Sequence, residues 1–141
     1  MRIIFVCTGN TCRSPLAESI AKQEIEGCVI ESRGIFAIDG YPISKNSQEI
    51  LSAKHLPESS VSQSFTSDDL AADYIFTMSQ THKNSLFNQY GEQKNIYTLK
   101  EFVGEKGDIS DPFGGNKNDY EAIFDELSAL IVKLKQKLMK A

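Results

Sequence analysis

Residues 3–22 have the sequence IIFVCTGNTCRSPLAESIAK, and this stretch decides the fold. Its first part, Ile3-Ile4-Phe5-Val6, is a continuous apolar run, typical of a strand buried on both faces. The following residues 7–13 contain few helix formers. Ser14-Pro15 then has the pattern of an N-cap followed by proline at the first helical position. The sequence therefore predicts a strand, a short loop and a helix that runs to about Glu26 and is ended by Gly27.

Strands and helices continue to alternate along the rest of the chain. Further strands are predicted at residues 28–32, 74–78 and 95–99, further helices at 46–55, 80–90 and 118–139, and loops at 36–44 and 101–115. This alternation indicates βαβ units, which build a parallel sheet with helices on both faces. We therefore expect an α/β fold, a three-layer α/β/α arrangement around a four-stranded parallel sheet, in a single domain spanning residues 1–141.

Composition excludes several classes of function. The 141 residues are 40% hydrophobic and carry a formal net charge of −4, so a core can form without metals or disulfides. An acidic chain does not have the basic face that nucleic acids or anionic membranes usually require. Its apolar runs are shorter than the ~20 residues that span a bilayer. The run at residues 3–6 is also too short for a signal-peptide core, so we expect a cytoplasmic protein.

Thiols and guanidinium groups cluster near the N-terminus. The chain has three cysteines, an odd number and too few for a disulfide scaffold. Cys28 is predicted to be a core residue of the second strand. Cys7 and Cys12 lie within seven residues of Arg13, one of only three arginines in a chain with twelve lysines. Composition alone does not explain this clustering.

A loop between a strand and a helix N-terminus can bind an anion. Its backbone N–H groups turn inward, and the helix dipole adds positive potential, which favours a phosphate-like dianion. The same field favours the thiolate of Cys7 near neutral pH. Arg13 supplies a planar fork for two phosphate oxygens. Gly9 permits the turn, and Asn10 can hold the loop through its side chain or a left-handed conformation. A nucleophile in such a cradle points to displacement at phosphorus.

Residues 7–15 closely resemble the signature of low-molecular-weight protein tyrosine phosphatases, Cys-x-Gly-Asn-x-Cys-Arg-Ser-Pro. Asp111-Pro112 resembles the general-acid loop of that family. The order of strands and helices fits as well, so the resemblance covers nearly the whole chain. It implies the Rossmann-like phosphatase I fold and a reaction through a phosphocysteine intermediate.

The resemblance also implies roles for individual residues. Cys7 would attack phosphorus, and Asp111 would protonate the leaving group and then activate water. Ser14 would support the thiolate, Asn10 would keep the loop in shape, and Cys12 would trap an oxidised Cys7 as a reversible disulfide. The phosphate-binding residues would be Thr8, Gly9, Asn10, Thr11, Cys12 and Arg13. No metal or other cofactor is implied, because Arg13 and the loop amides supply the positive charge.

Two positions favour phosphoarginine as the substrate. Thr11 stands where tyrosine-specific members usually carry isoleucine, and the aromatic pair after Asp-Pro is reduced to Phe113-Gly114. Both features resemble the bacterial protein-arginine phosphatase branch. Thr11 leaves room for a planar guanidinium and offers it a hydroxyl acceptor. Phe36 and Phe113 would be the aromatic walls. The expected partners are phosphorylated proteins, with inorganic phosphate or a similar oxyanion in the site, and the chain is expected to be a monomer.

Three alternatives remain open at this level. The first is a protein tyrosine phosphatase of the same family. The second is an arsenate reductase, although its redox relay needs cysteines downstream of Cys28 and this sequence has none there. The third is a phosphoprotein-binding module, which would not need both a thiol nucleophile and an acid. His55 and His82 are predicted to lie on exposed helix faces, and no residue spacing suggests a metal site.

Overall fold

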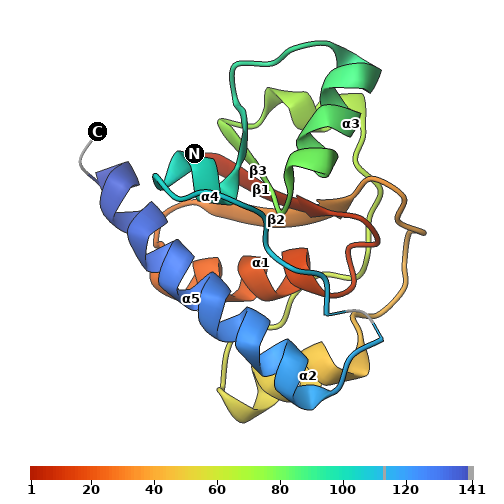
Figure 1. The fold of residues 1–141 in the computed structure, drawn as a ribbon, viewed down its shortest axis with the longest axis vertical. Helices are drawn as coiled ribbons and strands as arrows, with labels where there is room; N and C mark the ends of the chain where they lie inside the picture. Colours follow the sequence, from red (N-terminus) through yellow and green to blue (C-terminus); the bar gives the residue numbers. More distant parts are fainter. Residues whose placement is uncertain (113, 140–141) are drawn as a thin grey trace.

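The computed structural model describes residues 1–112 and 114–139, and its α/β architecture confirms the predicted fold (Figure 1). The strands described are β1 (Arg2–Cys7), β2 (Val29–Gly34), β3 (Tyr74–Thr77) and β4 (Ile96–Thr98). The helices are α1 (Arg13–Glu24), α2 (Lys45–Ala53), α3 (Gln80–Tyr90), α4 (Leu99–Phe102) and α5 (Lys117–Met139), with a 3₁₀ turn η1 (Ser67–Ala71). Within this part of the chain the strands pair in parallel in the order β2-β1-β3-β4.

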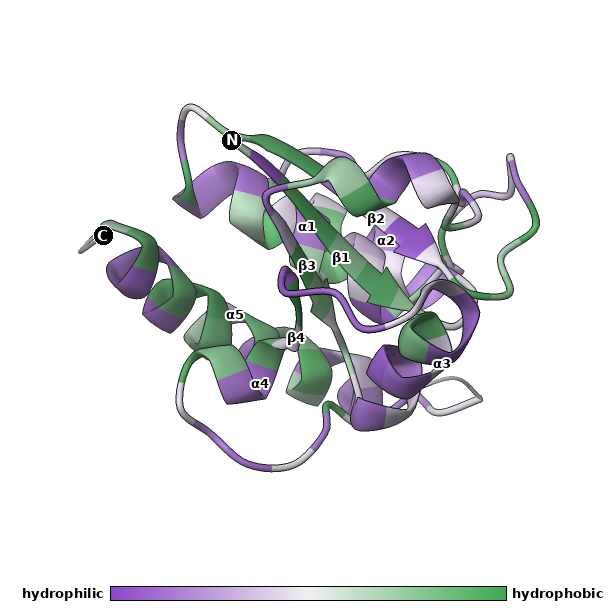
Figure 2. Cartoon of the chain, turned by 90° about the horizontal axis from the view of Figure 1, so that it is seen from above, coloured by the Kyte–Doolittle hydropathy of each residue, from purple (hydrophilic) through white to green (hydrophobic). Residues whose placement is uncertain are grey.

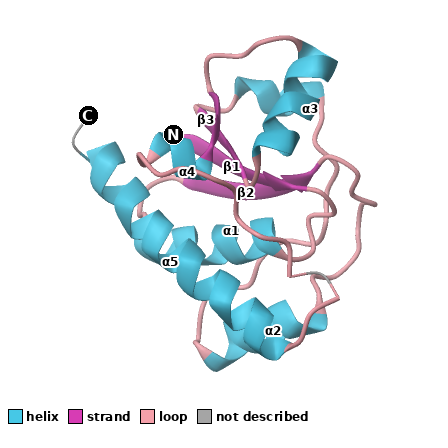
Figure 3. Ribbon diagram, in the orientation of Figure 1, coloured by secondary structure: helices cyan, strands magenta, loops and turns pink. Residues whose placement is uncertain are grey.

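Side chains of β1 alternate between the two faces of the sheet. Ile3 and Phe5 belong to the core that α1 and α5 cover, whereas Ile4 and Val6 belong to the core on the side of α3. Figure 3 shows these helices on opposite sides of the sheet, and Figure 2 shows the hydrophobic strands between them. Because both faces are covered, β1 is apolar from Ile3 to Val6, as the sequence pattern predicted.

The carboxyl ends of the central strands meet at one edge of the sheet. Cys7, the last residue of β1, is paired in register with Gly34 at the end of β2. Val6 is paired with Thr77 at the end of β3. In open parallel sheets, ligands bind outside the carboxyl ends of the strands, next to the N-termini of the helices that follow them. The fold therefore places the loop of residues 7–13 where a site is expected.

The first helix does not begin as predicted. It starts at Arg13 with Cys12 as its N-cap, and Cys12 makes no side-chain capping bond. Ser14 and Pro15 therefore lie inside the first turn, where proline is tolerated because the first amides have no partner within the helix. The expected N-cap role of Ser14 is wrong because its hydroxyl is used elsewhere, within the loop. The helix also ends earlier than predicted, at Glu24.

Two short helical segments were missed. One is α4, which lies within residues predicted as the end of a strand and a loop. It begins after Thr98, whose hydroxyl accepts a hydrogen bond from Glu101 N. The Glu101 carboxylate in turn accepts a hydrogen bond from Thr98 N. The segment η1 has the same reciprocal cap between Thr66 and Asp69. Thr-x-x-Glu at 98–101 is a capping-box pattern that the sequence displays, so the first of these was detectable.

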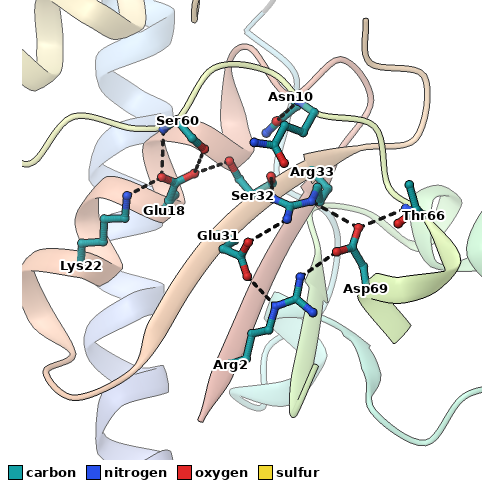
Figure 4. A network of polar contacts seen from close by, with 11 residues as sticks. Arg2, Asn10, Glu18, Lys22, Glu31, Ser32, Arg33, Ser60, Thr66 and Asp69 are labelled. Carbon is teal, nitrogen blue, oxygen red and sulfur yellow. Dashed lines mark hydrogen bonds and ion pairs between the residues drawn. The ribbon is translucent and has the colours of Figure 1, made fainter. Parts of the chain in front are cut away.

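Polar side chains attach the segment before β3 to the second strand (Figure 4). Asp69 of η1 binds Arg2 at 2.7 Å and Arg33 at 3.2 Å, and both arginines also bind Glu31 of β2. These contacts use the two arginines outside the loop of residues 7–13. Thr66 N donates to Asp69 Oδ2 at 3.0 Å, which connects the residue before η1 to the same network.

A second group of contacts in Figure 4 surrounds the fully buried Glu18 of α1. Its carboxylate accepts hydrogen bonds from the Ser60 backbone and hydroxyl at 3.0 and 3.1 Å, and pairs with Lys22 at 2.7 Å. Such partners are required because a buried charge without them is costly.

Among the described helices, none is both long and apolar enough to cross a membrane.

Candidate active site

The loop of residues 7–13 begins with a buried thiol that contacts the first turn of α1. Cys7 is only 3% exposed, and its Sγ lies 2.9 Å from Ser14 Oγ. Asn10 Nδ2 donates to the same Ser14 oxygen at 2.8 Å. The single hydroxyl hydrogen of Ser14 can then go to Cys7 Sγ, or to the more distant Arg33 carbonyl oxygen at 3.4 Å. The shorter contact favours donation to sulfur, which stabilises a thiolate.

Asn10 determines the shape of the loop. Its backbone has φ 55°, the left-handed conformation that asparagine tolerates better than most residues. Its side chain is fully buried, and its Oδ1 accepts from Gln63 N at 2.9 Å. Asn10 therefore connects Ser14, in the first turn of α1, to the segment between Ser60 and Thr66, two residues whose contacts Figure 4 shows.

The loop is also bound from outside by the chain that follows β2. Phe36 N donates to Thr8 O at 2.9 Å, and Ser44 N donates to Thr11 O at 2.8 Å. Gly34 allows this close approach, since a Cβ there would lie 2.6 Å from Thr8 O and 2.9 Å from Asn10 N. Both contacts are with backbone atoms, which cannot move aside, so glycine is required at this position.

Arg13 and Asp111 come together although they are far apart in the sequence. Ile109 N donates to Met78 O at 2.9 Å, which attaches the segment before Asp111 to the end of β3. The buried Arg13 guanidinium donates from Nη1 to Ile109 O at 2.9 Å. Its Nη2 lies 3.6 Å from Asp111 Oδ2, and the Asp111 side chain is half-exposed. The Asp111 carboxyl group thus lies beside the Arg13 guanidinium at the end of the loop of residues 7–13.

These residues enclose a cavity of about 250 Å³ lined by Cys7, Thr8, Gly9, Thr11, Cys12, Arg13 and Asp111. Every one of these residues was singled out from the sequence. Asn10 and Ser14 are fully buried and do not line the cavity, although Asn10 was also predicted among the phosphate-binding residues. Phe36 is 77% exposed on the loop after β2, so it is not a core residue. The predicted role of Phe113 lies outside the described residues.

A family model described as low molecular weight phosphotyrosine protein phosphatase matches residues 2–141. The chain belongs to this family. Its members are cysteine-based protein phosphatases, which agrees with a buried thiol in an anion-binding loop. Phosphorylated proteins are therefore the class of substrate.

Named relatives of this low molecular weight phosphatase differ in the substrate that their names give. A relative from Staphylococcus epidermidis, low molecular weight protein-tyrosine-phosphatase PtpB, is 52% identical and covers 97% of this chain and 99% of the relative. The structure of YwlE arginine phosphatase from Geobacillus stearothermophilus has a TM-score of 0.94 and 38% identity, over 99% of this chain and 93% of that chain. A third similar structure, at TM-score 0.94 and 39% identity, covers 99% of this chain and 97% of that chain; it is the C7S mutant of YwlE arginine phosphatase with a phosphorylated active-site serine.

Tyr120 is a member of this phosphatase site that sequence reasoning missed. Its hydroxyl lies 3.5 Å from Cys12 Sγ, and its ring comes from the buried face of α5. Burial, and secondarily the contact with Cys12, raise the pKa of Tyr120 to about 12, so the hydroxyl stays protonated. Tyr120 continues the apolar spacing of Ile123 and Leu127 along the helix, and this pattern alone predicts only a core position.

His82 contradicts its predicted exposure. It lies in the first turn of α3 and is 6% exposed. Its Nε2 is 2.9 Å from Thr8 Oγ1, and its Nδ1 is 3.0 Å from Ser79 Oγ. The prediction failed because the face of α3 that carries His82 packs against the phosphatase loop, which no local pattern reveals. His55 is exposed, as expected.

Burial, together with the nearby Arg13, lowers the pKa of His82 from its ordinary 6.5 to about 4. The unfolded chain therefore binds a proton at a higher pH than the folded chain does. Neutral His82 therefore contributes to the free energy of unfolding above about pH 6.5, and this contribution is lost as the pH falls towards 4. The free energy of unfolding changes by about 3 kcal/mol over this range. We expect urea unfolding of the wild type to show this loss already between pH 7 and pH 5.

The control for this prediction is a pair of histidine variants. His82→Gln should have a smaller pH dependence over the same range, whereas His55→Gln, at an exposed position, should behave like the wild type. An identical slope for wild type and His82→Gln would contradict the assignment.

The remaining thiol is outside the site. Cys28 precedes β2 and is only partly buried, packed against the core that α1 and α5 cover. Its prediction as a strand residue is wrong by one position, because β2 begins at Val29. Across the described residues, no group of three or more His, Cys, Asp or Glu side chains could hold a metal ion.

Proposed function

We propose that this chain is a protein-arginine phosphatase that works through a phosphocysteine intermediate. The observation that carries the proposal is that Cys7, Thr11 and Asp111 line one cavity together with the loop of residues 7–13. The family membership supports the cysteine chemistry, and the YwlE structures support phosphoarginine as the substrate. We further propose that residues 1–141 form one domain, which the family match over residues 2–141 supports.

In the first step, Cys7 Sγ attacks phosphorus and forms the S–P bond while the P–N bond to the guanidinium breaks. Asp111 gives its proton to the departing nitrogen, so that the arginine side chain leaves as a guanidinium cation and not as the strongly basic neutral guanidine. Arg13 and the loop amides from Thr8 to Arg13 bind the equatorial oxygens as their charge redistributes. The 3.6 Å separation between Arg13 and Asp111 supports roles around one phosphoryl group.

In the second step, Asp111 accepts a proton from water, whose oxygen bonds to phosphorus as the S–P bond breaks. Cys7 leaves as a thiolate, which the Ser14 hydroxyl at 2.9 Å stabilises. Asn10 holds Ser14 in place. We also propose that Cys12, which lines the same cavity, forms a disulfide with an oxidised Cys7 and so protects it from further oxidation.

Thr11 provides the basis for selecting phosphoarginine. In the described residues its hydroxyl has one contact, a long 3.9 Å approach to Cys12 Sγ. That hydroxyl can therefore accept from a guanidinium N–H beside the phosphoryl group. Isoleucine at this position would crowd the planar group and leave its N–H bonds unmet. The exposed ring of Phe36 would flank the substrate.

A protein tyrosine phosphatase is the second candidate, and the name of the Staphylococcus epidermidis relative favours it. A phosphotyrosine would place its phosphoryl group on the same loop and its ring beside the exposed Phe36. The two candidates share every step at phosphorus. They differ in the leaving atom and in what Thr11 contacts.

The test compares kcat/KM on matched phosphoarginine and phosphotyrosine peptides. We expect the wild type to prefer phosphoarginine, and we expect Thr11→Ile to lower the arginine-to-tyrosine ratio by roughly 10- to 100-fold. Thr11→Val removes the hydroxyl with little change in volume, and it should lower the ratio by a smaller factor. A wild type that prefers phosphotyrosine would overturn the arginine assignment in favour of the second candidate.

A further inference from the structure

The contacts of His82 form a continuous chain from α3 to the active-site cavity. Ser79, the N-cap of α3, contacts His82 Nδ1 at 3.0 Å, and His82 Nε2 contacts Thr8 Oγ1 at 2.9 Å. Thr8 directly follows Cys7 and lines the cavity. The reaction proposed above assigns no role to this imidazole. Its hydrogen positions follow from which groups need a donor or an acceptor.

The Ser79 hydroxyl is the group that fixes the tautomer. It is buried, and its oxygen already accepts from the His82 backbone N at 3.3 Å. Among the described residues, its own hydrogen has one acceptor within reach, His82 Nδ1. If Nδ1 carried a hydrogen, the buried Ser79 hydroxyl would have no acceptor, which is costly. Nδ1 therefore accepts, and Nε2 carries the hydrogen.

An Nε2–H that donates to Thr8 Oγ1 determines what Thr8 can do. The Thr8 oxygen accepts from His82, so its own hydrogen is directed away from the imidazole. In the part of the chain that the structure describes, Thr8 Oγ1 has no other hydrogen-bond partner. With the opposite tautomer, Thr8 would donate to His82 and present only lone pairs to the cavity, which repel an anion.

We infer that His82 is a positioning residue whose Nε2–H holds the Thr8 hydroxyl as a hydrogen-bond donor to the phosphoryl oxygens bound next to Cys7. The charged groups that face His82 are Arg13 from α1 and Asp108 and Asp111 from the segment after β3. Burial and Arg13 oppose a second proton on the ring, and the two carboxylates favour one. The neutral ring persists because the first two effects are larger, and neutrality leaves Nδ1 able to accept.

The tautomer can be observed directly in the unmodified protein. The chain has two histidines, so ¹⁵N spectra of a histidine-labelled sample contain two imidazoles, and His55→Gln assigns them. We expect His82 to be the Nε2–H tautomer at pH 7. An Nδ1–H tautomer, or a doubly protonated ring at that pH, would overturn the inference. This measurement needs no variant of the site to fold and no turnover.

A double-mutant cycle tests whether His82 acts through Thr8. His82→Leu should lower kcat/KM for para-nitrophenyl phosphate by ~10-fold and weaken inhibition by inorganic phosphate. His82→Gln, whose amide can still donate to Thr8, should recover part of this loss. In a Thr8→Val background, His82→Leu should add less than about twofold. An equal loss in both backgrounds would show that His82 supports only the fold and would overturn the inference.

The inference rests on the proposed reaction at Cys7, and the two can fail separately. Turnover that persists in Cys7→Ser would remove the reaction while leaving the tautomer measurable. Conversely, Cys7-dependent turnover combined with an additive cycle would leave the reaction intact and remove the role of His82. His55→Gln serves as the matched control, with kinetics like those of the wild type.

Discussion

Replacing Cys7 with serine is expected to lower turnover of para-nitrophenyl phosphate by about 10⁴-fold or more, because an unionised hydroxyl is a far weaker nucleophile than a thiolate. The loop should otherwise remain intact, since the Ser14 and Asn10 contacts behind it do not require sulfur. Inorganic phosphate should therefore still bind, as measured by calorimetry.

Cys28→Ser is the matched control for this loss. It makes the same change of sulfur to oxygen at a partly buried position outside the cavity. Its turnover should equal that of the wild type under the same conditions. Full activity in Cys7→Ser, or an equal loss in both variants, would exclude a phosphocysteine mechanism.

Asp111→Asn should have an effect that depends on the leaving group. A guanidine leaves poorly unless it receives a proton, so turnover of a phosphoarginine peptide should fall by about 10²- to 10⁴-fold. The para-nitrophenolate anion is stable without protonation, so the loss on para-nitrophenyl phosphate should be much smaller. Inhibition by inorganic phosphate should persist, because the loop and Arg13 are retained. Comparing kcat on the two substrates measures this difference.

Asp125→Asn, on the exposed side of α5, is the control for loss of one negative charge. It should leave both activities unchanged. Equal losses on the two substrates in Asp111→Asn would mean that Asp111 orients the loop or Arg13 and does not donate a proton to the leaving group. Unchanged kinetics would remove Asp111 from the mechanism altogether.

The features that could be predicted from the sequence are those that depend on neighbours along the chain. The apolar run before Cys7 must be buried on both faces, and a loop between such a strand and a helix has few possible shapes. The strand and the loop of residues 7–13 were therefore predicted, and with them every lining residue of the cavity except Asp111. Asp111 was found differently, through the resemblance of Asp111-Pro112 to a known loop. Its distance from Arg13 depends on the backbone hydrogen bond from Ile109 N to Met78 O, which no local pattern specifies.

The features that could not be predicted depend on contacts between distant segments. His82 and Tyr120 have ordinary positions in amphipathic helices, and only packing brings them to Thr8 and Cys12. Ser14 shows a second kind of failure. Serine before proline favours an N-cap on local grounds, but its hydroxyl can serve either the helix end or the thiol. Here the contacts with Cys7 and Asn10 replace the cap.

The outside attachments of the loop affect when activity first arises during synthesis. The backbone partners of the loop are Phe36 and Ser44, and its side-chain partners extend to His82 and Tyr120, so all of these residues follow Cys7 along the chain. A nascent chain that ends before these segments carries the nucleophile without a competent site. Catalysis therefore begins only after the residues up to Tyr120 have been synthesised and packed around the loop, and enzyme activity reports that packing.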